Sequence, residues 1–171
     1  MPLAATHKII CIDECHFRRD ADKRRCWSPI GTSPIVYVNG STENTNVYGA
    51  YTLDGRFHYK FAKRQLAAIT INFFKHLIRI YKKIVLIVDR AKWHTAKAVW
   101  DFVNKNPQKI QLFLFPKASP ELNPVEECWH QTRSIVTANK TFNNTVELKK
   151  SLRKQWNKQK FKHNIINYLC R

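Results

Sequence analysis

The sequence predicts an α/β fold in which helices flank a mixed β-sheet. Two Asx-Gly dipeptides separate β-rich runs in the N-terminal third of the chain, a pattern typical of antiparallel strands. Further along, segments with strand and helix patterns alternate, which favours parallel pairing. The 171 residues suffice for about one domain. A hydrophobic content of 44% excludes a disordered chain.

The N-terminal part predicts strands before any helix. A short β-branched run at residues 9–12 is stopped by Asp13 and Glu14, as expected of a buried strand. A basic stretch of irregular structure follows. The turn signals then place three more strands in an antiparallel meander, at 35–38, 47–53 and 57–61.

The remainder predicts alternating helices and strands. Apolar residues recur at intervals of three and four over 63–81, which indicates an amphipathic helix. A strand at 84–88 ends at Asp89, a helix over 95–106 ends before Pro107, and another strand covers 110–115. Two further helices are expected, one opening at Asn123-Pro124 and one from Thr145 onward.

Two acidic residues follow apolar strands, where functional groups gather in open α/β sheets. These are Asp13 and Asp89, and we expect them to be neighbours on adjacent strands. The alternative is that each simply terminates its strand or caps the next element. Glu126 is the third candidate, although its spacing from Asn123 also fits a helix capping box. Glu127 lies about 100° further round that helix and cannot face the same way.

Three clustered carboxylates require a cation, because each pair would repel by about 4 kcal/mol at ~4 Å and an effective dielectric of ~20. Oxygen ligands favour Mg²⁺ or Mn²⁺, and a pair of ions can activate an attacking oxygen and stabilise a leaving oxygen at phosphorus. The chain has neither a Gly-x-Ser-x-Gly elbow nor a Walker loop. A phosphoryl transfer without a protein nucleophile is therefore the chemistry that these residues favour.

The charge of the chain points to nucleic acid. Thirty Lys and Arg against twelve Asp and Glu give a net charge of +18, although a Lys-rich solvated surface is the alternative. Apolar runs are too short to span a membrane, and no secretory signal is visible. Five cysteines without a Cys-x-x-Cys pair favour reduced thiols in a cytoplasmic or nucleoid location. A zinc site of Cys11, Cys15, His16 and Cys26 is conceivable, but its spacing fits no usual pattern.

Three ordered blocks resemble the DDE transposases of the IS630 group, relatives of the Tc1/mariner elements. They are Ile12-Asp13-Glu14-Cys15-His16-Phe17, Val88-Asp89-Arg90-Ala91-Lys92-Trp93-His94, and Ser119-Pro120-Glu121-Leu122-Asn123-Pro124-Val125-Glu126-Glu127-Cys128-Trp129. The stretch Trp27-Ser28-Pro29-Ile30-Gly31-Thr32-Ser33-Pro34 also resembles a family motif. Thirty-six residues separate Asp89 from Glu126, within the mid-thirties range of the family.

The resemblance implies an RNase H-like α/β fold with a mixed five-stranded sheet. By carry-over, Asp13, Asp89 and Glu126 would form the catalytic, metal-binding triad for two Mg²⁺ or Mn²⁺ ions. Residues 1–140 would be the catalytic core, and 141–171 a basic helical extension of the same domain. The implied activity is DNA cleavage at element ends and joining to a target, suggested to be a TA dinucleotide. Another RNase H-like nuclease, or an inactive or repurposed DNA-binding protein, is the alternative.

The resemblance also implies partners. Double-stranded DNA, as terminal inverted repeats and target, would be the substrate. Family members usually have helix-turn-helix modules upstream, whereas here the first catalytic strand begins by residue 9, so we expect a separate helix-turn-helix polypeptide or self-dimerisation. Arg90 stands where the family usually has Asn, and this cation could aid phosphate binding.

Basic residues in three regions are candidate DNA contacts. They are Arg18, Arg19, Arg24, Arg25, Arg90, His94, Lys150, Arg153 and Lys154. Such contacts give affinity without sequence choice. His94 would sit beside the triad, either touching DNA or as a hydrogen-bonded histidine that starts a helix. Trp156 and Phe161 are expected to face the core rather than to stack on bases.

Overall fold

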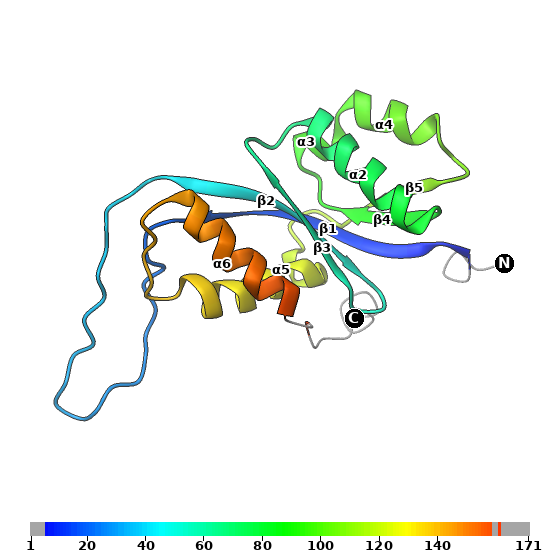
Figure 1. The fold of residues 1–171 in the computed structure, drawn as a ribbon. Coiled ribbons are helices and arrows are strands. Elements are labelled where there is room, and N and C mark those ends of the chain that lie inside the picture. Colours follow the sequence, from blue (N-terminus) through cyan, green and yellow to red (C-terminus); the bar gives the residue numbers. More distant parts are fainter. Residues whose placement is uncertain (1–5, 159–160, 162–171) are drawn as a thin grey trace.

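The computed structural model describes residues 6–158 and 161, and its centre is a five-stranded mixed sheet of order β3-β2-β1-β4-β5 (Figure 1). Antiparallel pairing joins β1 to β2 and β2 to β3, and parallel pairing joins β1 to β4 and β4 to β5. The bounds are β1 Lys8–Arg18, β2 Asn44–Thr52, β3 Phe57–Ala62, β4 Ile84–Val88 and β5 Ile110–Leu114. The predicted mixed sheet is confirmed.

Helices cover both faces of this sheet, as Figure 1 shows. On one face lie α2 Ala67–Tyr81, α3 Lys92–Thr95 and α4 Lys97–Asn104. On the other lie α5 Pro124–Thr132, the π-helical turn η2 Arg133–Thr137 and α6 Thr145–Lys158, while the short turn η1 Pro120–Leu122 leads into α5.

Side-chain alternation along β1 divides the interior into two cores. Ile10 and Ile12 pack in the cluster with α2 and α4, whereas Cys11 and Phe17 pack in the cluster with α5 and α6. The predicted amphipathic helices pack on the two faces of the sheet, because each presents an apolar stripe to it. The central strand therefore presents consecutive side chains to two different environments.

Trp156 and Phe161 lie inside the second core, as expected. Trp156 is buried on α6 and donates from Nε1 to Thr132 Oγ1 at 2.9 Å. Phe161 is buried against Phe57, with ring centroids 4.9 Å apart. Neither ring is available for stacking on a base. No helix in residues 6–158 is both long and apolar enough to cross a membrane.

Three predicted elements differ from the structure. Residues 35–38 form no strand, because β2 occupies the pairing edge of β1 from Ile10 to Arg18. The same pairing extends β1 far beyond the predicted 9–12, to Arg18, because β2 pairs with the backbone of residues 13–18 even where the side chains are polar. The helix predicted at 95–106 is the shorter α4, and a separate helix, α3, precedes it and ends at Thr95, because Ala96 between them is extended with a ψ of 143°.

The segment between β1 and β2 leaves the body of the domain as a long excursion (Figure 1). Residues 23–43 contain no strand or helix, and Trp27, Ile30 and Tyr37 are exposed there. Exposed side chains of this size are typical of interaction surfaces when they lie close together.

The C-terminus of α2 is strained at Lys82, which has φ 63° and ψ −49°. Glycine adopts a positive φ without a steric penalty, so Lys82→Gly should raise the free energy of unfolding by about 1 kcal/mol. Urea denaturation measures the change. Lys83→Gly is the matched control, because Lys83 lacks a positive φ and its replacement should not stabilise the protein. Equal effects of the two substitutions would contradict strain at Lys82.

Candidate active site

Asp13 lies inside β1, where the sheet changes its pairing. The parallel register of β1 with β4 ends at the pair Cys11 and Ile87, and the antiparallel register with β2 continues through Asp13 opposite Gly49. The same offset, continued by two residues, places Asp13 beside Asp89. The sequence predicted that β1 ends at Asp13, but the strand continues to Arg18. Asp13 lies at the point where β1 loses its pairing with β4.

Asp13, Asp89 and Glu126 all line one cavity of about 320 Å³. The structure thus brings together the three predicted carboxylates from β1, the end of β4 and the first turn of α5. Further lining residues are Arg90, Phe115, Lys117, Ser119 and Asn123. An acidic centre with a cationic wall is the arrangement expected of a site that binds a metal ion and a phosphate together.

Asp13 is the most desolvated of the three carboxylates, with only 8% of its surface exposed. Burial raises its pKa well above the usual value, and the negative charges of Glu126 and Glu14 raise it further. Trp129 Nε1 donates to Asp13 Oδ2 at 3.0 Å and favours the charged form, but this bond is outweighed. Ionised Asp13 therefore needs a positive partner.

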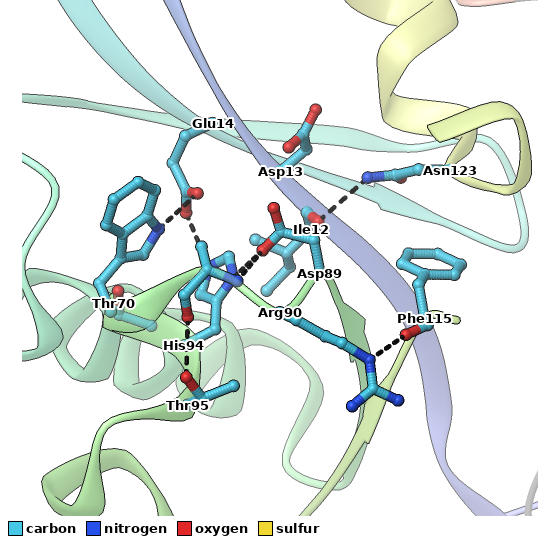
Figure 2. A network of polar contacts seen from close by, with 12 residues as sticks. Ile12, Asp13, Glu14, Thr70, Asp89, Arg90, His94, Thr95, Phe115 and Asn123 are labelled. Atoms are coloured by element: carbon cyan, nitrogen blue, oxygen red, sulfur yellow. Dashed lines mark hydrogen bonds and ion pairs between the residues drawn. The ribbon is translucent and has the colours of Figure 1, made fainter. Parts of the chain in front are cut away.

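Asp89 follows β4 and is half exposed, with its orientation set by two donors to one oxygen. The Ala91 N–H and His94 Nδ1 both donate to Oδ1, at 3.0 and 2.6 Å (Figure 2). Partial burial alone would raise the pKa of this carboxyl, but these bonds lower it below the usual value. Asp89 is therefore held as a carboxylate.

Glu126 reaches the cavity because its helix is tied to β1. Asn123 caps α5 by accepting from the Val125 N–H at 3.2 Å, and its Nδ2 donates to Ile12 O at 3.4 Å (Figure 2). The alternative capping box does not form, since the Asn123 N–H is bonded to Pro120 O. Burial raises the pKa of Glu126, Arg133 opposes that shift, and Asp89 adds to it.

His94 is a buried bridge between two carboxylates. Nδ1 bonds Asp89, and Nε2 lies 2.9 Å from Glu14 Oε1. Burial alone would lower the pKa of the imidazole, but the two carboxylates raise it to about 9. The ring has no exposed surface and is bonded at both nitrogens, so in this structure it lies as a buried, hydrogen-bonded histidine and offers no surface for contact with DNA.

The carboxylate oxygens form a donor set that fits Mg²⁺ or Mn²⁺. In residues 6–158 and 161, however, no three His, Cys, Asp or Glu side chains stand close enough to hold one ion together. Asp13, Asp89 and Glu126 thus line one cavity, but their carboxylates are farther apart than three ligands of a single metal ion. The zinc site of Cys11, Cys15, His16 and Cys26 is wrong, because His16 faces the opposite side of β1 from the two buried cysteines and Cys26 is exposed.

Of the nine predicted DNA contacts, only Arg90 lines the carboxylate cavity, where its Nε donates to Phe115 O at 3.1 Å. Arg19 pairs with Glu43 at 3.0 Å, and Arg24 donates to Ser134 Oγ at 2.9 Å. Arg153 lies over the Phe61 ring, 5.1 Å from its centroid. The others are exposed on the surface, namely Arg18, Arg25, Lys150 and Lys154.

Sequence reasoning missed several residues that shape the site. Trp129, which donates to Asp13, was given no role in the site, and Glu14 was interpreted only as an acid that ends its strand. Arg133 lies seven residues after Glu126, a helical spacing that could have indicated it. It lines a second hollow of about 420 Å³ that also reaches Glu126, with Glu14, Cys15, His16, Trp129 and His130.

Sequence comparison matches the chain to one family model and to two relatives. Residues 8–149 match the family model described as DDE superfamily endonuclease. The Tc3 transposase of Caenorhabditis elegans is 26% identical over 161 residues, covering 87% of this chain and 48% of that protein. A Sinorhizobium fredii protein, y4pE/y4sA, is 33% identical over 90 residues, covering 49% of this chain and 63% of that protein.

Solved structures share the fold. The Mos1 transposase in its paired-end complex with the left transposon end superposes with a TM-score of 0.70 at 18% identity, over 96% of this chain and 51% of that one. The catalytic core of BIV integrase superposes with a TM-score of 0.56 at 16% identity, over 96% and 94%. The fold is therefore RNase H-like, as expected, and the chain spans about half the length of the Tc3 and Mos1 proteins. The chain belongs to the DDE superfamily endonuclease family.

Proposed function

We propose that this domain cleaves DNA strands at the ends of an insertion element and transfers them to target DNA, with Mg²⁺ or Mn²⁺ bound by Asp13, Asp89 and Glu126. The observation that supports the proposal most strongly is the convergence of these three carboxylates on one cavity. Asp13 adds weight, because a carboxyl group with so little exposed surface and two acidic neighbours is stabilised by a bound cation.

A pair of bound ions would supply Lewis acidity to the attacking and leaving oxygens of an in-line displacement. The protein residues do the rest of the work. Asp89 is held ionised and in one orientation by His94 and the Ala91 N–H. Arg90 and Lys117 offer cations to the scissile phosphate from the cavity wall, and the buried setting of Asp13 excludes water from one side of the site.

Double-stranded DNA is the proposed partner, as terminal inverted repeats and as target. Mos1 complexes with a transposon end and in strand transfer support this proposal by fold. We also propose a separate helix-turn-helix polypeptide or a second copy of the chain as the source of end recognition. The exposed Trp27 and Ile30 suit contact with another polypeptide. The free thiols of Cys11, Cys15, Cys26 and Cys128 suit a reduced compartment such as the cytoplasm or nucleoid.

The activity can be tested on labelled duplexes with and without element ends, alongside an RNA–DNA hybrid. We expect nicking of the end-bearing duplex with Mg²⁺ or Mn²⁺ and none in EDTA, because the carboxylates alone cannot activate an attacking oxygen. Preferential cutting of the hybrid would instead identify another RNase H-like nuclease. Salt-sensitive DNA binding without any metal effect on cleavage or stability would identify a repurposed DNA-binding protein.

A further inference from the structure

We infer that Glu14 is a positioning residue, which acts through His94 to fix which oxygen of Asp89 faces the cavity. The inference rests on the proposed function, because it concerns how the chain prepares Asp89 to bind metal. Figure 2 shows the chain of contacts from Glu14 through His94 to Asp89.

Glu14 is engaged at both oxygens. Oε1 accepts from His94 Nε2 at 2.9 Å, and Oε2 accepts from Trp93 Nε1 at 2.8 Å. Its side chain is 5% exposed. Glu14 follows Asp13 on β1 and therefore points to the other face of the sheet, toward α3 rather than α5. Glu14 is also not among the residues that line the carboxylate cavity, so it acts on the site through the two side chains that donate to it.

The His94 ring is fixed at both ends, because both of its nitrogens contact carboxylate oxygens. A ring held this way cannot turn without breaking a buried hydrogen bond. With His94 Nδ1 and the Ala91 N–H both directed at Oδ1, the described bonds leave Oδ2 as the oxygen of Asp89 that is open to the cavity. Partners that orient a ligand in this way are typically worth 10–100-fold in metal affinity.

The test measures the Mn²⁺ dissociation constant of the full chain by electron paramagnetic resonance, together with the metal-free melting temperature. Glu14→Gln should weaken Mn²⁺ binding about 10–100-fold, because an amide cannot accept from both donors. The variants His94→Asn and His94→Gln distinguish a role in orienting Asp89 from a role in folding alone, because each keeps the hydrogen-bonding position of a different ring nitrogen. The Asn amide lies near the place of Nδ1 and can still donate to Asp89, whereas the Gln amide lies near Nε2. Mn²⁺ should therefore bind more tightly to His94→Asn than to His94→Gln.

Asp54→Asn is the matched control, since it removes a carboxylate that pairs with Lys8 and Arg56 away from both cavities. It should leave Mn²⁺ affinity unchanged. A Glu14→Gln protein that melts earlier but binds Mn²⁺ within about twofold of the parent would overturn the inference and make Glu14 purely structural, as would equal affinities of the two His94 variants. A parent protein that binds no Mn²⁺ would instead refute the proposed metal site, and the inference with it.

Discussion

Replacement of Asp13 by Asn should abolish DNA cleavage and, at the same time, stabilise the metal-free domain. The loss of activity should be at least about a thousandfold, because several kcal/mol of metal-assisted charge stabilisation depend on this ligand. The gain in stability arises because ionised Asp13 is buried beside Glu126 and Glu14. The Asn amide oxygen can still accept the bond from Trp129 Nε1 without carrying a charge.

The stability effect of Asp13 should depend on pH. A carboxyl whose pKa is raised in the folded state is stabilising below its unfolded pKa, and this contribution is lost as the pH rises through the folded pKa. The melting temperatures of the parent and Asp13→Asn proteins in EDTA should therefore be close near pH 4 and diverge toward pH 8, where the variant gains about 1 kcal/mol. A parent protein more stable than the variant at pH 8 would contradict the burial of an unpaired charge.

Asp89→Asn serves as the internal control. It removes the charge of a second carboxylate in the same cavity, but it should lower the free energy of unfolding where Asp13→Asn raises it. The pKa of Asp89 is lowered by its bonds from His94 and the Ala91 N–H, so its charge is stabilising above the unfolded pKa. Asp89→Asn should lose cleavage as Asp13→Asn does, but it should melt earlier at pH 8. Calorimetry in EDTA distinguishes the two variants, and cleavage assays in Mn²⁺ compare their activities.

Gly49→Ala should be the most destabilising single methyl group that can be added to the sheet. A Cβ at this position would overlap Trp129 Cη2 and lie 2.5 Å from Trp129 Cζ2, closer than side chains approach. Overpacking of this kind costs about 1–3 kcal/mol or more, because a buried indole cannot move without displacing its neighbours. Trp129 also donates to Asp13, so the displaced ring should disturb the site as well. Urea denaturation and Mn²⁺ affinity both report the change.

The double variant Gly49→Ala with Trp129→Phe tests the cause. Phe has no atoms at the Cζ2 and Cη2 positions of the indole, so the added methyl group should cost much less in that background than in the parent. Additive losses of the two substitutions would show that the clash is not the source of the destabilisation.

The strand-helix alternation was readable in the sequence because β-branched runs and amphipathic periods are local signals. The end of β4 at Asp89 and the start of α5 at Pro124 are examples. The length of β1 was not readable, since polar residues interrupt the apolar run after Ile12 and residues 13–18 become a strand only because β2 pairs with them. Residues 35–38 show the converse, a β-prone composition without a neighbouring strand.

The candidate site also has one part that could be predicted from the sequence and one part that could not. Asp13, Asp89 and Glu126 follow from motif spacing, whereas the partners that orient them depend on contacts across about eighty to more than a hundred residues. Trp129 reaches Asp13 over 116 positions, and His94 reaches Glu14 over 80. His94 was ambiguous in sequence because its exposure depends on the packing of α3 against β1, which no local pattern encodes.

The first turns of α5 supply both Glu126 and Trp129, one aimed into the cavity and the other bonded to Asp13. Asp13 on β1 and Asp89 at the end of β4 both belong to the sheet, whereas Glu126 is carried by α5. The bond from Trp129 to Asp13 holds this helix against β1. The distance of Glu126 from the two aspartates is therefore set by how one short helix packs on the central strand.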